Sequence, residues 1–179
     1  MHLTDHLRLL ADYNAWMNGQ LYDAAARLPA AELAAPKGAF FGSILGTLNH
    51  LVVADTIWLQ RFARHPAGAS ALQTVAQWPA PAALNQILFD TLPALRTRRE
   101  ALDALITQWV DQLDDAALAS PLHYRNTRGE AFTRHLHAVL VHVFNHQTHH
   151  RGQVTTLLSQ AGVDPGVTDL LTRIPQLTA

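Results

Sequence analysis

The chain has 179 residues, 49% of them hydrophobic and 15% charged, with a formal net charge of -1. This composition is typical of an ordinary soluble globular protein and lacks the basic excess that nucleic-acid binding requires. The absence of cysteine excludes disulfides, thiolate zinc sites, iron–sulfur clusters and a cysteine nucleophile. We expect residues 1–179 to form one domain. The N-terminal stretch carries charges and no continuous apolar run, which predicts neither a signal peptide nor a membrane span, and hence a cytoplasmic protein.

The first half of the chain predicts two long helices. Apolar residues recur at helical spacing from about residue 4 to residue 28, and again from about residue 44 to residue 63, where Ser43 is placed to cap the second helix. The connection is short enough to favour antiparallel neighbours. The second helix is apolar nearly all round, a pattern that fits a core on one side and a subunit partner on the other.

A long connection separates the second helix from the third. Residues 64–81 are rich in proline, glycine and serine, and a loop of this length allows a crossover between parallel or non-adjacent helices. The third helix is predicted over residues 82–113. Pro93 must either kink it or mark a restart after Thr91, because proline lacks the N–H that a helix interior uses.

The last third of the chain predicts a hairpin-like excursion and a fourth long helix. Residues 120–133 place Tyr and Phe on either side of an Asn-Thr-Arg-Gly turn, and residues 134–160 then follow a helical pattern that Gly162 ends. The tail, residues 163–177, contains enough leucine and isoleucine to pack back on the helices. The predicted fold class is all-α, a four-helix bundle with a short hairpin-like excursion before the last long helix.

The last helix carries a pair of histidines suited to binding one ion. His146 and His150 stand one turn apart and about 40° apart around the helix axis. They share a stripe with core-type aliphatics, namely Val139, Val143 and Leu157. Two neutral imidazoles can ligate zinc or a similar ion, and a catalytic site adds a third protein ligand and a water.

His50 is the best candidate for that third ligand. It is the single histidine of the second helix and lies at mid-helix among leucines and valines. A buried imidazole needs a polar partner, so the alternative is that His50 makes only a buried hydrogen bond. The same alternative holds for His146 and His150, which would then form a hydrogen-bond network without metal.

The remaining histidines of the last helix fit less well. Ligands at 142, 146 and 150 would have to converge over about 12 Å of helix rise, which excludes His142 from the same ion. We therefore expect His142 to support a ligand or to pack within the bundle. His149 lies about 60° to the side of His146, and His137 lies on the far face, so both are interpreted as surface or interface residues. Asp55, beyond His50 on the second helix, is either an orienting partner of a ligand or a capping or surface residue.

The absence of glutamate at two kinds of position narrows the possible types of metal site. Gln147, rather than Glu, follows His146, so the sequence does not support a zincin protease. None of the glutamates, Glu32, Glu100 and Glu130, has histidine three residues later, as diiron bundles require. A mononuclear site remains.

Four segments together resemble the DinB family of DNA-damage-inducible bundle proteins. They are YNAWMN (13–18), GSILGTLNHLVVAD (42–55), FNHQTHHRGQV (144–154) and GVDPGVTDLL (162–171), and the His-x-x-x-His-Arg-Gly-Gln run is the most specific of their motifs. The resemblance covers almost the whole chain and implies a four-helix bundle that forms a homodimer. By motif position, the family's metal ligands fall on His50, His146 and His150.

The resemblance implies metal binding more firmly than any reaction. The family and the broader YfiT-like group include S-transferases that use low-molecular-weight thiols, a maleylpyruvate isomerase, hydrolases and proteins with no known reaction. One hypothesis is therefore a metal-dependent thiol S-transferase or hydrolase that acts on a small molecule, with one divalent ion, zinc or nickel. The other is a non-catalytic, damage- or stress-induced dimeric protein that binds metal for stability or sensing. Neither hypothesis involves nucleic acid or a membrane.

Overall fold

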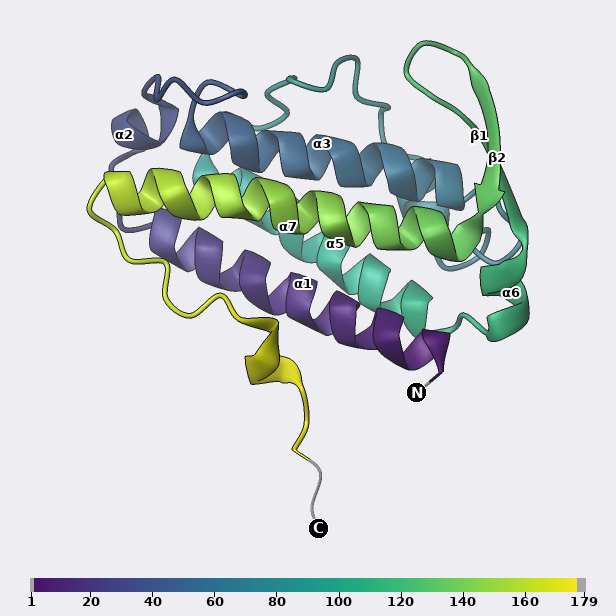
Figure 1. Ribbon diagram of the computed structural model, residues 1–179. Coiled ribbons are helices and arrows are strands. Elements are labelled where there is room, and N and C mark those ends of the chain that lie inside the picture. The colour runs from purple at the N-terminus through teal and green to yellow at the C-terminus, as the bar shows by residue number, and fades with distance from the viewer. Residues whose placement is uncertain (1, 177–179) are drawn as a thin grey trace.

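A computed structural model describes residues 2–176 of the chain and confirms the predicted all-α bundle with a small hairpin (Figure 1). Leu177, the last residue of the predicted tail, lies outside the described residues. The elements in chain order are α1 (Leu3–Ala25), α2 (Ala30–Ala34), α3 (Ile44–Phe62), α4 (Gln73–Ala76), α5 (Leu92–Asp111), α6 (Asp115–Ala119), β1 (Pro121–Arg125), β2 (Ala131–His135), α7 (Leu136–Gln160) and the 3₁₀ helix η1 (Leu170–Arg173). Within residues 2–176, none of the helices has the length and apolar character needed to cross a membrane.

The four long helices are α1, α3, α5 and α7, and each packs against two of the others. Helix α1 packs on α5 and α7, and α3 packs on the same two helices. Figure 1 shows α1 and α7 running in one direction and α3 and α5 in the opposite one. The prediction that the first two helices are neighbours was wrong, because residues 26–43 form α2 and a loop that carry the chain to the diagonal position. The predicted crossover is present, since residues 63–91 connect the parallel helices α3 and α5.

Helix α3 begins where the sequence predicted. The Ser43 hydroxyl accepts a hydrogen bond from the backbone N–H of Gly46 at 3.0 Å, which satisfies one of the free donors of the first turn. Every residue from Ile44 to Thr56 is buried. Helices α5 and α7 cover one side of α3, while α2, α4 and residues 82–91 lie against it from the other. The second apolar face of α3 is therefore covered, at least in part, within the same chain.

Helix α5 begins at Leu92, directly after Thr91, so the predicted start at residue 82 was wrong and Pro93 belongs to the first turn of the helix instead of kinking it. Pro93 stands in the first turn, where its missing N–H costs nothing. The residues before it are held by the fully buried Asn49, whose amide donates to the carbonyl of Phe89 at 2.9 Å and accepts from the N–H of Leu88 at 2.8 Å. These tertiary hydrogen bonds hold the segment in a non-helical conformation.

The hairpin between α6 and α7 confirms the predicted excursion. Strands β1 and β2 pair antiparallel, with Pro121 opposite His135 and Arg125 opposite Ala131, and Gly129 adopts φ +83° in the turn. Helix α7 starts at Leu136, two residues later than predicted, because Arg134 and His135 belong to β2. Its end at Gln160 matches the prediction.

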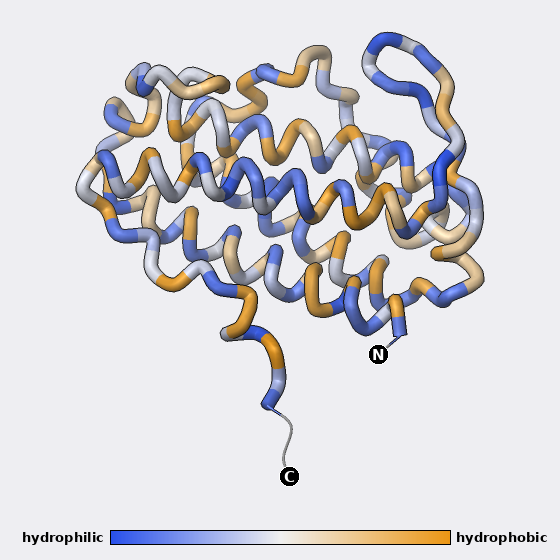
Figure 2. Tube along the Cα trace, viewed as in Figure 1, coloured by the Kyte–Doolittle hydropathy of each residue, from blue (hydrophilic) through white to orange (hydrophobic). Residues whose placement is uncertain are grey.

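The core lies between the four long helices, whose residues alternate between hydrophilic and hydrophobic along each helix (Figure 2). Its largest fully buried apolar side chains include Leu7, Met17, Tyr22, Leu59, Phe62 and Trp109. The tail packs back on the helices, as predicted, with Val163 in the core, Leu170 packed against it and polar contacts to α1. The Tyr13 hydroxyl donates to the carbonyl of Thr168 at 2.6 Å, and Arg173 pairs with Asp12 at 2.7 Å, whereas Leu171 remains exposed.

Candidate metal centre

The antiparallel contact of α3 and α7 brings the three predicted ligands together. His146 and His150 project from one face of α7, and His50 projects toward them from the middle of α3. One ring nitrogen of each lies within 4.8 Å of the others, and the Nε2 atoms of His50 and His146 are 3.2 Å apart. His50 and His150 are buried and His146 is half-buried. Within residues 2–176 this is the one cluster of three histidine or acidic side chains that could hold a metal ion.

Hydrogen bonds orient two of the three imidazoles. The Nδ1 of His50 lies 2.8 Å from the backbone carbonyl of Leu84, and the Nδ1 of His150 lies 2.8 Å from the Oε1 of Gln153. Both oxygens can only accept, so each Nδ1 carries the proton and each Nε2 keeps its lone pair free. Metal-binding histidines in proteins are commonly held by such a partner on the second nitrogen.

The cluster favours neutral imidazoles. Burial, helped by His150 and His50, lowers the pKa of His146 to about 3. Burial also lowers the pKa of His50, against the opposing effect of the Leu84 carbonyl, and the pKa of His150. Neutral imidazole is the form that ligates a metal ion. Near neutral pH, the three histidines would therefore not have to release protons before they bind one.

An aromatic side chain that the sequence did not single out closes one side of the cluster. Phe41 stacks on the His50 ring at 3.7 Å between centroids and meets the His150 ring edge-on at 5.4 Å. It precedes Gly42, which adopts φ +79°, and the capping residue Ser43, so the start of α3 places it over the ligands. In the sequence, the two phenylalanines shortly before the capping Ser43 were the feature that could have indicated an aromatic side chain over the site.

The other histidines of α7, His137, His142 and His149, lie outside the cluster. His142 is exposed, and its ring centroid lies 6.1 Å from that of His146. His149 is exposed and lies 3.4 Å from the Nε2 of Gln153. His137 is half-buried near the start of α7.

Asp55 neither orients a metal ligand nor serves as a capping or surface residue, the two roles that the sequence suggested. It is buried, with 1% of its surface exposed, and its Oδ2 accepts hydrogen bonds from Arg99 of α5 at 2.6 Å and from the Gln147 side chain. Gln147 stands between the two ligands of α7 and is fully buried. Asp55 therefore ties α3 to α5 and α7, and it contacts the residue that separates the ligands rather than the ligands themselves.

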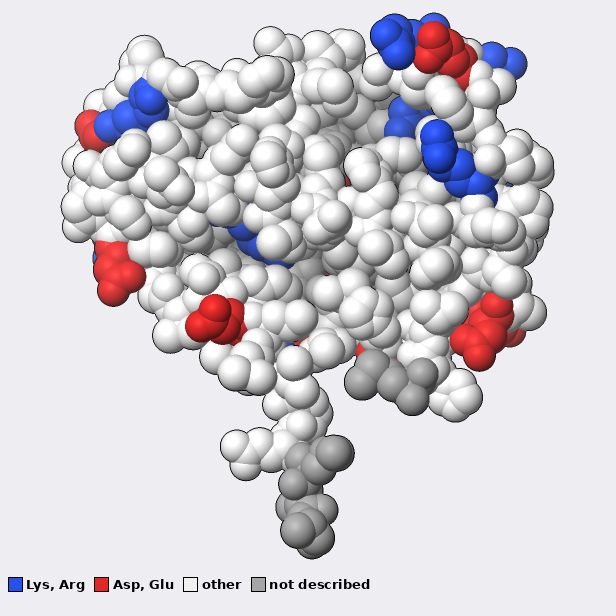
Figure 3. Space-filling model, in the orientation of Figure 1, with Lys and Arg blue, Asp and Glu red and all other residues white. Residues whose placement is uncertain are grey.

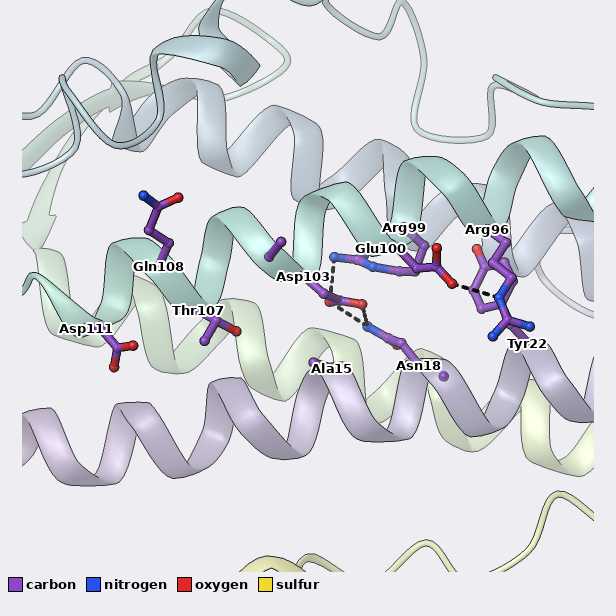
Figure 4. Close-up of a pocket in the computed structure, with 12 residues that line it drawn as sticks. Ala15, Asn18, Tyr22, Arg96, Arg99, Glu100, Asp103, Thr107, Gln108 and Asp111 are labelled. Carbon is purple, nitrogen blue, oxygen red and sulfur yellow. Dashed lines mark hydrogen bonds and ion pairs between the residues drawn. The ribbon is translucent and has the colours of Figure 1, made fainter.

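The buried polar network continues to the opposite side of the bundle. Arg99 also pairs with Asp103 at 2.9 Å, and Asp103 accepts a hydrogen bond from Asn18 of α1 (Figure 4). Asn14, one turn earlier on α1, donates to the same carboxylate. Burial raises the pKa of Asp103 to about 6 despite the nearby Arg99. Arg99, Asp103 and Asn18 line a groove of about 590 Å³ between α1 and α5, and none of the three histidines lines it.

Two smaller cavities lie on either side of the histidine cluster along α7. One, of about 400 Å³, is lined by Gln153, His149 and residues 37–40. The other, of about 320 Å³, is lined by His142, Trp58 and Tyr124. Three histidine ligands leave one or more coordination positions for water or substrate, so small molecules have space next to the cluster.

Comparisons with known proteins identify the family of the chain. The family model described as DinB family matches residues 2–176. Protein DinB of Bacillus subtilis (strain 168) is 28% identical over 167 residues, which cover 93% of this chain and 92% of that protein. A search of the solved structures found no significant match. The match over nearly the full length shows that the chain belongs to the DinB family.

Proposed function

We propose that His50, His146 and His150 bind one divalent transition metal ion, zinc or nickel, and that the protein is a metal-dependent thiol S-transferase or hydrolase for a small molecule. The observation that carries the proposal is the orientation of the ligands. The side-chain nitrogens converge within 4.8 Å, while Leu84 and Gln153 hold the outer nitrogens of His50 and His150. A hydrogen bond from His146 could use the lone pair of His50, but it would not require His150 to direct a second free lone pair to the same place.

The donor set suits such an ion. Imidazole nitrogens are good ligands for zinc and nickel, and three neutral ligands leave the charge of the ion uncompensated. The ion would lower the pKa of a water or thiol in an open coordination position, which generates a nucleophile at neutral pH. The chain's own contribution is to orient the imidazoles, to keep them unprotonated by burial and, through Phe41, to shield one side of the site from solvent.

Metal analysis of protein purified without a histidine tag tests the binding. We expect about one ion per chain in the wild type and loss of the ion in His146→Ala. His142→Ala is the matched control, since His142 lies one turn away on α7 and outside the cluster, and it should retain the ion. A wild-type protein that stays metal-free after incubation with zinc or nickel would refute the proposal.

Catalysis needs a separate test. The metal-loaded protein is screened with low-molecular-weight thiols and electrophiles, and with ester substrates, against the chelated protein. Turnover that requires both the ion and His146 would establish an enzyme. The absence of turnover, with a large loss of thermal stability on chelation, would instead support non-catalytic metal binding. That second function is favoured by one observation: the ligands come from both α3 and α7, so an ion would cross-link the two helices.

The homodimer that the resemblance implies stays a prediction. The apolar circumference of α3 does not by itself require a partner, because α2, α4 and residues 82–91 lie against its second face. Light scattering of the metal-loaded protein measures the assembly directly.

A further inference from the structure

A cavity lies beside His142, one helical turn from the candidate metal centre. It has a volume of about 320 Å³, at the lower end of the range for small-molecule pockets, about 300–1,000 Å³. His142, on its wall, stands one helical turn before His146, and the two ring centroids are 6.1 Å apart. His142 therefore stands between the cavity, which it lines, and His146, the nearest of the three predicted ligands along α7.

Aromatic and aliphatic groups form the walls of the cavity. Trp58 of α3 meets Tyr124 of β1 edge-on at 5.2 Å and His142 of α7 edge-on at 5.5 Å. Ala138 and Val139 complete the wall on α7. Such a lining favours the edge or face of a planar, apolar body.

The charged groups around the cavity are all positive. Arg134 lines it directly, and the guanidinium of Arg61 lies 4.4 Å above the Trp58 ring and 5.4 Å from the Tyr124 ring. Among the described residues, neither arginine has an ion-pair partner, and no acidic residue lines the cavity. Figure 3 shows blue side chains gathered around the hairpin on this face, with red beside them only at the hairpin tip. Within residues 2–176, no carboxylate pairs with the positive charge beside the cavity.

We propose that this cavity binds the substrate of the metal centre and that the substrate is an organic anion with a planar apolar body, held by Trp58 and Tyr124 and recognised by Arg134. The assignment of this ligand as substrate rests on the proposed function. The recognition itself depends on residues outside the histidine cluster. Arginine is suited to the task because its planar guanidinium binds a carboxylate with two parallel hydrogen bonds.

Two probes of the same shape test the recognition of charge. Binding of 2-naphthoate and of the neutral 2-naphthamide is measured by calorimetry on the full-length protein, both metal-loaded and chelated. We expect naphthoate to bind about tenfold more tightly than naphthamide, as a charge-assisted hydrogen-bond pair would give. Arg134→Gln should remove this preference and leave naphthamide binding unchanged, and Trp58→Leu should weaken both probes. The matched control is Arg128→Gln at the exposed hairpin tip, which should bind as the wild type does.

The outcomes separate this inference from the proposed metal function. Equal affinity for the two probes, or a preference that survives in Arg134→Gln, would overturn the inference even if the protein holds its ion. A preference that disappears on chelation would also overturn it, because the ion rather than Arg134 would then recognise the carboxylate. A preference that persists without metal and requires Arg134 supports the recognition, whatever the metal analysis finds.

Discussion

The Nε2 atoms of His50 and His146 lie 3.2 Å apart at the contact between α3 and α7. Two nitrogens bound tetrahedrally to one zinc ion at 2.0–2.1 Å are separated by about 3.3 Å. Without an ion, the same distance suits a hydrogen bond from His146 to His50, whose own proton is held on Nδ1 by Leu84. The separation of the two nitrogens is therefore close to the one that a shared zinc ion would require. Without an ion, the same two nitrogens can form a hydrogen bond with each other.

Gln153 should control metal affinity through His150. Gln153→Ala removes the acceptor that holds the Nδ1 proton of His150, and we expect metal affinity to fall by about 10- to 100-fold with little loss of stability. Gln153→Glu keeps an acceptor and should retain most of the affinity. Competition with a chromophoric chelator measures these values. Gln160→Ala, near the end of the same helix, is the control, and equal affinity of Gln153→Ala and the control would contradict the orienting role.

Phe41 should slow the release of the ion. Phe41→Ala removes the ring stacked on His50 and opens the site to water, so transfer of the ion to excess chelator should become roughly tenfold faster. The adjacent Phe40 is 86% exposed and offers a matched control, because Phe40→Ala removes the same group without touching the ligands. Stopped-flow absorbance follows the transfer. Identical release rates in the two variants would show that Phe41 does not shield the site.

Asp55 should be important for stability rather than for ligation. Asp55→Ala leaves the fully buried Arg99 without its closest carboxylate, and we expect a loss of about 3 kcal/mol in the free energy of unfolding. Glu100→Gln removes a carboxylate from an exposed pair with Arg96 and should cost less than about 1 kcal/mol. Urea denaturation at pH 7 compares them. A loss in Asp55→Ala no larger than in the control would indicate that Asp103 alone suffices for Arg99.

The metal-free protein should lose stability as the pH falls below the ordinary pKa of histidine. His146 is neutral in the folded state down to a pKa of about 3, whereas in the unfolded chain it takes up a proton near its ordinary pKa of 6.5. Between these values the unfolded state binds more protons, so stability rises with pH across this window and is lost as the pH decreases. The contribution at pH 5.5 is about 1 kcal/mol after allowance for partial exposure.

Comparison of chelated wild type with chelated His146→Gln isolates this effect. The difference in their free energies of unfolding should change between pH 7 and pH 5 in favour of the variant, which has no group to protonate at this position. Urea denaturation at each pH gives the values. A difference that stays constant with pH would mean that His146 titrates alike in the folded and unfolded chain.

Local sequence patterns determined most of the helices and two of the candidate ligands. Helical periodicity placed the long helices, Ser43 marked the start of α3, and the spacing of His146 and His150 put both on one face of α7. These features depend on residues within a few turns of one another, so they can be read without knowing the fold.

Only the tertiary structure decided the rest. Residues 82–91 are not helical, contrary to the prediction, because Asn49 and His50 form hydrogen bonds with their backbone carbonyls. Both residues are distant from this segment in the sequence. Asp55 faces Arg99 instead of a ligand because α5, and not α1, is the neighbour of α3. The sequence by itself made His50 the best candidate for the third ligand. Only the packing of α3 against α7, with α1 and α3 in diagonal positions, brings the Nε2 atom of His50 to His146. Such contacts depend on which helices pack together, and periodicity within one helix carries no information about its neighbour.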